Sequence, residues 1–163
     1  MKLTAIYPGT FDPITLGHAD LACRASKLFD KIIIGVASSP KKETLFSLAE
    51  RTTMAEEMFA DKPTIEIDSF EGLLINFAKQ KNATVIIRGM RAVSDFEFEF
   101  QLASMNRSLA PDIESVFLTP TEKFSFLSST LVREVSQLGG DVSDYVHPHI
   151  NKALENKYQR AKI

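Results

Sequence analysis

Short runs of apolar residues alternate along the chain with longer segments in which apolar residues recur every three or four positions. The short runs are typical of strands and the wider spacing is typical of helices. The pattern predicts strands at 3–7, 32–37, 64–68, 84–87 and 115–118. It predicts helices at 17–29, 47–59, 71–80, 94–109, 128–138 and about 149–160. Because strands and helices alternate, we expect an α/β fold whose sheet is mostly parallel.

Two strands differ in polarity, and the difference predicts where they lie in the sheet. The run at 32–37 is apolar throughout, as a strand buried on both faces should be. The run at 64–68 (TIEID) is more polar, which favours a place nearer an edge. Capping boxes at Ser47 and Ser94 predict two helix starts, and the pair Gly139–Gly140 predicts a helix end.

The segment 94–109 is ambiguous, because FEFEF at 96–100 alternates like a strand while its capping box and continuation favour a helix. As a helix, it carries two apolar sides. One side holds Phe96, Phe100 and Ala103, and the other holds Phe98, Leu102, Met105 and Leu109. A helix that is apolar on two sides packs on two things, of which the sheet is one. The second is either a partner subunit or a ligand channel.

Size and charge narrow the class of protein. The 163 residues fit one domain, at 1–163, and apolar residues make up 44% of them. The net charge of −2 disfavours a general nucleic-acid binder. Cys23 is the single cysteine, so no intramolecular disulfide can form, which suits a reducing compartment. No segment reads as a signal peptide or a membrane span, and we expect a cytoplasmic protein without a membrane partner.

Candidate chemistry lies in the loops that follow the strands, because ligands of such sheets bind beyond the carboxyl ends of the strands. The first loop has neither a dinucleotide-binding nor a P-loop glycine pattern. It has Gly9 and Thr10 at the strand end, and Gly17 and His18 at the helix start. A helix start offers free amides that suit a phosphate, and glycine allows a ligand to approach the backbone. The imidazole of His18 can donate a hydrogen bond to a phosphoryl oxygen.

Other strand ends carry similar groups. Lys41 and Lys42 follow the second strand, Arg88 and Arg91 follow the fourth, and the run 125–130 (SFLSST) follows the fifth. Each feature alone is ordinary: a lone histidine, exposed lysines or a serine helix cap occur in most proteins. Their agreement at several strand ends indicates a phosphate site, since arginine and helix-start hydroxyls both suit phosphate oxygens.

Two motifs carry a family resemblance. Thr15-Leu16-Gly17-His18 resembles the first signature of the nucleotidyltransferase superfamily, and SSTLVR at 128–133 resembles its second, phosphate-binding signature. Over nearly the whole chain, the sequence resembles the bacterial-type phosphopantetheine adenylyltransferase family, and four stretches carry this resemblance: YPGTFDPITLGH at 7–18, SPKK, IRGMRAVSDFEFEFQLASMNR and FSFLSSTLVREV. The first motif alone is specific only to the superfamily.

The resemblance implies a reaction and an assembly. ATP and 4′-phosphopantetheine would give 3′-dephospho-coenzyme A and pyrophosphate, with Mg²⁺ as cofactor, in the penultimate step of coenzyme A synthesis. The implied fold is a Rossmann-like, doubly wound, five-stranded parallel sheet with helices on both faces. The resemblance further implies a homohexamer, built as a dimer of trimers, and feedback inhibition by coenzyme A.

The resemblance also assigns residues. The implied ATP site consists of Thr10, Phe11, His18, Gly89, Met90, Arg91, Glu99, Phe124, Ser125, Phe126, Leu127, Ser128, Ser129 and Thr130. The implied acceptor site consists of Thr10, Lys42, Leu74, Arg88, Leu102, Met105 and Asn106, of which Leu74, Leu102 and Met105 are equally well read as ordinary core. The implied catalytic residues are His18, Lys42, Arg91 and Thr10, with His18 stabilising the pentacoordinate α-phosphate. No residue is assigned to the metal, which ATP phosphates and water would hold.

Four positions leave detail open. Phe98 and Phe124 stand where relatives often carry Tyr or Trp, so any hydroxyl or indole hydrogen bond there is lost. Lys41 and Lys42 compete for one role, and the distance from Pro40 favours Lys42.

The chemistry fits these residues without a general base. A phosphate monoester has its second pKa at about 6 and is largely a dianion at neutral pH. The difficulty is to bring two anions together in line, so positioning and electrostatic stabilisation should do most of the work.

Other functions would be consistent with part of these sequence features. Nicotinamide-mononucleotide adenylyltransferase and glycerol-phosphate cytidylyltransferase share the first motif type, but they usually show His at the position of Thr15 and lack the FEFEFQLASMNR helix. A non-enzymatic nucleotide or coenzyme A sensor would use the same pocket. A purely structural protein would not require cationic residues at three strand ends.

Overall fold

One parallel sheet forms the centre of the molecule. The computed structural model describes residues 1–159, apart from the side chains of residues 93 and 94. The strands run in the order β3-β2-β1-β4-β5, and every pairing between neighbours is parallel. The strands are β1 (Thr4–Gly9), β2 (Lys31–Ala37), β3 (Ile65–Phe70), β4 (Val85–Gly89) and β5 (Glu114–Leu118). The polar strand β3 lies at an edge and the apolar strand β2 lies inside, as the sequence predicts.

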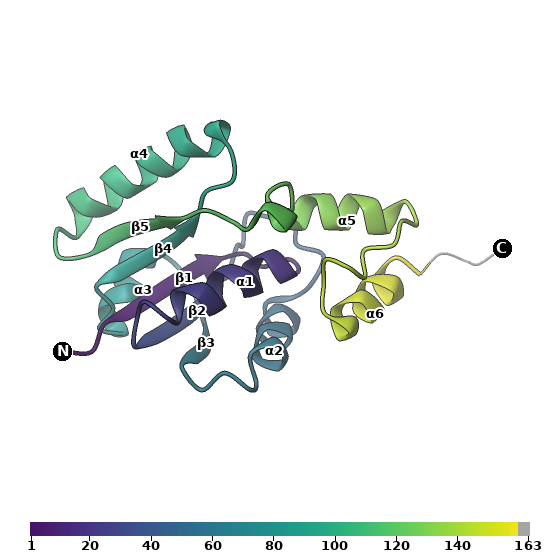
Figure 1. Cartoon of the computed structure of the whole chain (residues 1–163), viewed down its shortest axis with the longest axis horizontal. Coiled ribbons are helices and arrows are strands. Elements are labelled where there is room, and N and C mark those ends of the chain that lie inside the picture. Colours follow the sequence, from purple (N-terminus) through teal and green to yellow (C-terminus); the bar gives the residue numbers. More distant parts are fainter. Residues whose placement is uncertain (160–163) are drawn as a thin grey trace.

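Helices cover both faces of the sheet (Figure 1). They are α1 (Leu16–Ala25), α2 (Leu48–Met58), α3 (Leu74–Gln80), α4 (Val93–Leu109), α5 (Ser129–Gln137) and α6 (Pro148–Lys157). A short 3₁₀ helix, η1 (Glu122–Phe124), precedes α5. The predicted doubly wound, Rossmann-like α/β fold is therefore confirmed.

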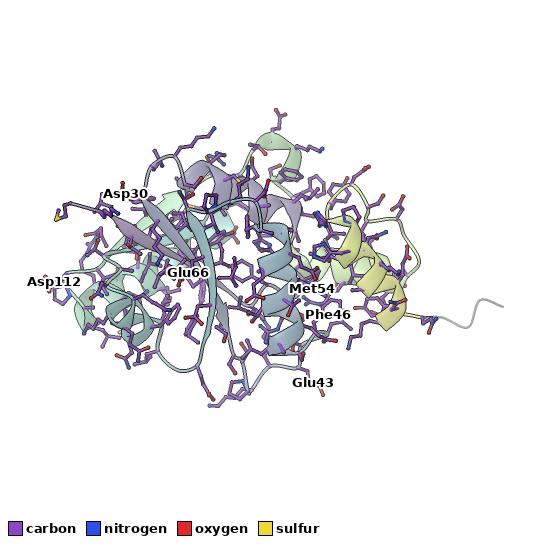
Figure 2. All side chains as sticks on the ribbon, turned by 90° about the horizontal axis from the view of Figure 1, so that it is seen from below. Asp30, Glu43, Phe46, Met54, Glu66 and Asp112 are labelled. Carbon is purple, nitrogen blue, oxygen red and sulfur yellow. The ribbon has the colours of Figure 1, made fainter. Side chains whose placement is uncertain are left out.

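The alternation of β1 side chains divides the core in two. Ala5 and Tyr7 belong to the larger cluster, to which α1, α2, α5 and α6 contribute. Ile6 belongs to the smaller cluster, which α3 covers through Ile75, Phe77 and Ala78. Figure 2 shows Phe46 and Met54 of the larger cluster between α2 and α6. Helices α5 and α6 therefore cover part of the larger cluster, and Figure 1 shows both of them at one end of the sheet.

The clearest differences from the predicted helix boundaries are at the end of α1 and at the start of α3. Helix α1 ends at Ala25 rather than at 29, because residues 26–28 tighten into a turn in which the Ser26 hydroxyl donates to the Cys23 carbonyl. Helix α3 begins at Leu74 rather than at 71, since Gly72 has a φ of +84°, outside the helical region.

Helix α4 begins at Val93, one residue before the prediction. The predicted capping box at Ser94 is wrong, because the N-cap is Ala92 and position 94 falls inside the helix. The last helix ends at Lys157, and the predicted end at about 160 lies outside the described residues. The Asp95 carboxylate instead accepts hydrogen bonds from the amides of Arg91 and Ala92. The predicted capping box at Ser47 and Glu50 is confirmed.

The order of strands reverses between β1 and β4, and ligands of doubly wound sheets bind at this point. The loops that follow β1 and β4 are therefore the first place to look for a site. Within the described residues, no helix is long and apolar enough to cross a membrane.

Candidate active site

A cavity of about 310 Å³ opens at the carboxyl ends of β1 and β4. It brings together most of the residues that the sequence assigned to one site. These are Thr10, Phe11, His18, Lys42, Arg88, Gly89, Arg91, Glu99, Phe124, Leu127, Ser128, Ser129 and Thr130. Lys42 lines the cavity and Lys41 does not, in agreement with the choice between the two lysines.

Other assigned residues do not line this cavity. They are Met90, Ser125, Phe126, Leu74, Leu102, Met105 and Asn106. The Met90 amide continues the sheet by donating to the Leu118 carbonyl, and Phe126 packs edge-on against Tyr145. Met105 is exposed and Asn106 is buried on α4. A pantetheine site along α4 stays a prediction.

His18 is held by the start of its own helix. The Thr15 amide donates to Nδ1 of His18 at 2.9 Å, and the His18 amide donates to the Thr15 hydroxyl at 3.3 Å. Because Nδ1 accepts a hydrogen bond from a backbone amide, the proton of the neutral ring lies on Nε2. Nε2 is then the ring atom left to donate to a ligand in the cavity. This reciprocal cap between Thr15 and His18 is not evident from the sequence motif, in which Thr15 stands only as a signature residue.

Burial keeps this imidazole neutral. Desolvation, with the positive charge of Arg91 as a smaller cause, lowers the pKa of His18 to about 4. Tyr7 and Phe11 pack around the ring, with the Phe11 ring edge-on at 5.0 Å between centroids. At neutral pH, His18 is therefore a hydrogen-bond donor rather than a cation.

The first loop adopts a strained conformation beside this ring. Phe11 has a φ of +50°, which non-glycine residues rarely adopt. This turn folds the Phe11 ring back over Gly9, where an added Cβ would come within 3.0–3.2 Å of the ring. A side chain at position 9 would therefore fit only if the Phe11 ring shifted by a few tenths of an ångström. At Gly17, by contrast, an added Cβ would make only ordinary contacts at 3.4 Å with Phe124 and Leu127. Access of a ligand to the Gly17 backbone stays a prediction.

Arg88 is paired with Glu99 rather than free in the cavity. The guanidinium donates from Nε at 2.9 Å and from Nη2 at 2.7 Å to the two carboxylate oxygens of Glu99. Glu99 is buried and lies on α4, so this pair connects β4 to the helix that follows it. Nη1 of Arg88 donates to the Pro8 carbonyl at 3.5 Å, and its second N–H is left for a ligand. The family-derived role of Glu99 as an ATP contact stays a prediction beside this observed one.

Arg91 connects the loop after β4 to the segment before α5. Its Nη1 donates to the Leu127 carbonyl at 2.8 Å, and its Nε lies 3.6 Å from the Asp95 carboxylate. On α5, the Ser128 hydroxyl accepts from the Leu131 amide, so Ser128 caps the helix. The Ser129 hydroxyl donates to the Pro13 carbonyl at 2.7 Å, which connects the two signature motifs directly.

The charges of the cavity favour an anionic ligand. Four cationic side chains line it, namely Lys42, Arg88, Arg91 and Arg133. The three acidic side chains that line it already accept hydrogen bonds: Asp12 from the amides of Leu45 and Phe46, Asp95 from those of Arg91 and Ala92, and Glu99 from Arg88. In the part of the chain that the structure describes, Lys42 forms no ion pair and no group of three metal-ligating side chains occurs.

Three residues of this region were missed by the sequence analysis, namely Asp12, Arg51 and Arg133. Arg133 Nη1 donates to the Asp12 carbonyl at 2.6 Å, across 121 positions of sequence. Asp12 and Arg51 likewise bond to main-chain groups 33 to 41 positions away. Asp12 lies inside the motif YPGTFDPITLGH and Arg133 inside SSTLVR, and this was the only sequence signal that could have pointed to them as site residues. For Arg51, no local motif gives one.

Comparison with solved structures finds the same fold in full-length relatives. A protein from Vibrio parahaemolyticus assigned as a nicotinate-nucleotide adenylyltransferase superimposes with a TM-score of 0.71 at 18% identity, over 99% of this chain and 98% of its own. The nicotinic acid mononucleotide adenylyltransferase of Plasmodium falciparum, solved with NaAD, gives 0.70 at 19% identity, over 98% and 97%. A lipopolysaccharide core biosynthesis protein from Thermoplasma volcanium gives 0.57 at 18% identity, over 75% and 100%.

The sequence itself matches a family model. Residues 6–135 match the cytidylyltransferase-like model, and this span contains both signature motifs and the lining of the cavity. At 18–19% identity, the solved structures support the fold alone. The family model supports membership of a family, because it covers most of the chain. The chain therefore belongs to the cytidylyltransferase-like family of nucleotidyltransferases.

Proposed function

We propose that this nucleotidyltransferase is an adenylyltransferase that transfers AMP from ATP to 4′-phosphopantetheine, giving 3′-dephospho-coenzyme A and pyrophosphate. One observation carries the proposal: His18, a neutral hydrogen-bond donor, lines the same cavity as four cationic side chains. The choice of acceptor rests on the resemblance of the whole chain to the phosphopantetheine adenylyltransferase family. The FEFEFQLASMNR helix and Thr15, where rival families usually carry His, support that choice.

The reaction is an in-line displacement at the α-phosphorus of ATP. An oxygen of the acceptor phosphate forms the new bond to phosphorus, and the bond to the bridging oxygen of pyrophosphate breaks. The acceptor is a dianion near neutral pH, so no base has to remove a proton. Thr10, Lys42 and the second N–H of Arg88 Nη1 bind the acceptor phosphate. His18 donates from Nε2 to the α-phosphate as charge grows there, which is how a preorganised donor lowers a barrier.

The remaining residues hold ATP. The start of α5 offers the amides of Ser129 and Thr130 and the Thr130 hydroxyl to the β- and γ-phosphates, and helix starts favour such anions. Arg91 adds positive charge beside the same segment, because it lines the cavity and donates to the Leu127 carbonyl. Mg²⁺ fits this arrangement as an ion held by ATP phosphates and water, because the described residues offer no cluster of protein ligands. Bound Mg²⁺ would neutralise charge on the polyphosphate.

Assembly into a homohexamer and inhibition by coenzyme A belong to the same proposal. Helix α4 leaves Phe96, Phe98, Phe100, Met105 and Leu109 exposed, and further copies of the chain would cover such a face. Coenzyme A carries the product's adenylate and pantetheine groups, so it would occupy the site that binds both substrates.

The test is pyrophosphate release with Mg²⁺, ATP and 4′-phosphopantetheine, run beside nicotinate or nicotinamide mononucleotide and beside CTP with glycerol phosphate. We expect release with phosphopantetheine alone. Release with another pair only would reject the proposed acceptor and keep the nucleotidyltransferase activity. No turnover with any pair, together with tight coenzyme A binding, would instead indicate a sensor.

Lys42 and Lys41 provide a matched pair for the same assay. Lys42→Met removes a cation from the cavity lining, and we expect the KM for the acceptor to rise at least about tenfold, as for loss of a charged hydrogen bond. Lys41→Met removes the neighbouring cation outside the lining and should leave that KM within about twofold. Equal effects of the two substitutions would contradict a specific phosphate contact at Lys42.

A further inference from the structure

Arg51 is a buried arginine whose hydrogen bonds all go to main-chain carbonyls. It lies on α2 and is only 2% exposed. Its Nη1 donates to the Thr10 carbonyl at 2.7 Å and to the Ala37 carbonyl at 2.9 Å, and its Nε donates to the Phe46 carbonyl at 3.1 Å. Arg51 does not line the cavity, so it does not itself meet a ligand there.

The three carbonyls belong to the two loops that would bind the acceptor phosphate. Thr10 directly follows β1, and Ala37 is the last residue of β2. Phe46 ends the loop that follows β2 and carries Lys42, and Figure 2 shows it beside α2. One guanidinium therefore joins the backbone at Thr10 to both ends of the Lys42 loop.

Asp12 completes this connection from the opposite direction. Its two carboxylate oxygens accept from the amides of Leu45 and Phe46, each at 2.9 Å. Arg51 thus binds a carbonyl of the first loop, and Asp12, in that loop, binds amides at the end of the Lys42 loop. Both groups are nearly fully buried, so these bonds are not weakened by competing water.

We infer that Arg51 is a positioning residue that fixes Thr10 and Lys42 relative to each other and so sets the affinity for the acceptor's phosphate monoester. The inference rests on the proposed function only in that the acceptor brings this phosphate. A displacement of about 1 Å in such a site can cost about a hundredfold in rate. The guanidinium also places a positive charge behind the first loop, where strand-end carbonyls would otherwise face an anion.

The alternative is that Arg51 only stabilises the fold, and Arg51→Lys separates the two. Lysine keeps the charge but has a single donor nitrogen, which cannot occupy the positions of both Nε and Nη1 and so cannot reach all three carbonyls. Arg24→Lys is the matched control, because Arg24 on α1 also donates to a main-chain carbonyl, that of Thr119, at 2.7 Å and outside the cavity lining.

The experiment measures the KM for the acceptor, the KM for ATP, kcat and thermal unfolding for wild type and both variants. The acceptor is whichever of phosphopantetheine, nicotinate mononucleotide or glycerol phosphate the wild type binds most tightly by calorimetry. For Arg51→Lys we expect the acceptor KM, or its Kd by calorimetry, to rise about tenfold or more, with the ATP value within about threefold. Arg24→Lys should change neither value.

The outcomes distinguish this inference from the proposed function. A selective loss of acceptor affinity with nicotinate mononucleotide as acceptor would support Arg51 and reject the proposed acceptor. A lower Tm with both KM values unchanged, or an equal rise in both, would overturn the positioning role. If Arg51→Lys does not fold, Asp12→Asn loosens the same connection, because its amide nitrogen cannot accept from a backbone amide, and it should show the same selective loss. A wild type that binds none of these phosphate monoesters would overturn both proposals.

Discussion

Helices α1 and α4 occupy comparable places in the fold, but they differ in which kind of side chain they bury. Each follows one of the two central strands between which the strand order reverses, and each lines the cavity with two side chains, His18 and Leu21 from α1 and Asp95 and Glu99 from α4. Helix α1 buries its apolar residues Leu21, Ala22 and Ala25. Helix α4 buries Glu99 and Asn106 and exposes large apolar side chains, among them Phe98, which is 63% exposed.

The difference indicates where each helix finds its packing partners. The apolar side of α1 is covered by this chain's own sheet and by α5 and α6 in the larger core cluster. The apolar side of α4 is left uncovered by the described residues, and its polar contacts with the cavity hold it in place instead. We therefore expect substitutions on α1 to change chemistry within one chain, and substitutions on α4 to change stability and assembly.

The largest expected effect is at His18 on α1. His18→Asn places an amide oxygen where Nδ1 lies, so the bond from the Thr15 amide is kept while the donor at Nε2 is lost. We expect kcat to fall about 10²- to 10³-fold, as for loss of a preorganised donor, with the KM for ATP within about threefold. Steady-state kinetics with both substrates measures the split. A higher KM for ATP with unchanged kcat would mean that His18 binds only the ground state.

The acid dependence of stability provides a second test of the same residue. The unfolded chain protonates His18 near pH 6.5, and the folded protein keeps it neutral down to about pH 4. Between these values the unfolded state binds more protons, so stability falls as the pH falls. The contribution of His18 to this loss is about 3 kcal/mol.

Urea unfolding of wild type and His18→Asn at pH 7 and pH 4 measures that contribution as a difference between the two proteins. Other groups that titrate in this range cancel in the comparison. Parallel curves for the two proteins would show that the ring is already solvated and that its pKa is ordinary.

On α4, the pair of Glu99 with Arg88 gives the next effect. Glu99→Gln keeps one acceptor but turns an N–H group toward the guanidinium, which leaves a buried charge partly unpaired. We expect the free energy of unfolding to fall by about 2 kcal/mol. Glu97→Gln, on the exposed side of the same helix, is the control and should change it by less than about 0.5 kcal/mol. Equal small changes for both would mean that the pair is effectively solvent-exposed.

The same contrast shows what the sequence could reveal. Strand positions, the edge place of β3 and the loops around the cavity were predicted, because they follow from local periodicity and from the topology of parallel sheets. Asp12 and Arg51 were not predicted as parts of the site, because their partners are main-chain groups in other loops and elements, up to 41 positions away, which no local pattern records. For α4, the sequence predicts two apolar sides, one of them packed on the sheet. That packing is wrong, because Phe96 on one side and Phe98 on the other are both exposed, and Glu99 and Asn106 turn inward instead, which periodicity does not reveal.

The smallest expected change in stability, and the sharpest test of the contrast, is at Phe98. If further copies of the chain cover α4, Phe98→Asp buries a charge in that interface and should lower the molecular mass measured by sedimentation. The folded monomer should lose less than about 0.5 kcal/mol of stability, since the side chain is exposed within one chain. Leu28→Asp is the matched control, because Leu28 is equally exposed at 63% but lies just after α1, and it should leave the mass unchanged. A wild type that is already monomeric, or a mass that falls equally for both variants, would mean that α4 is no more an interface than the rest of the surface.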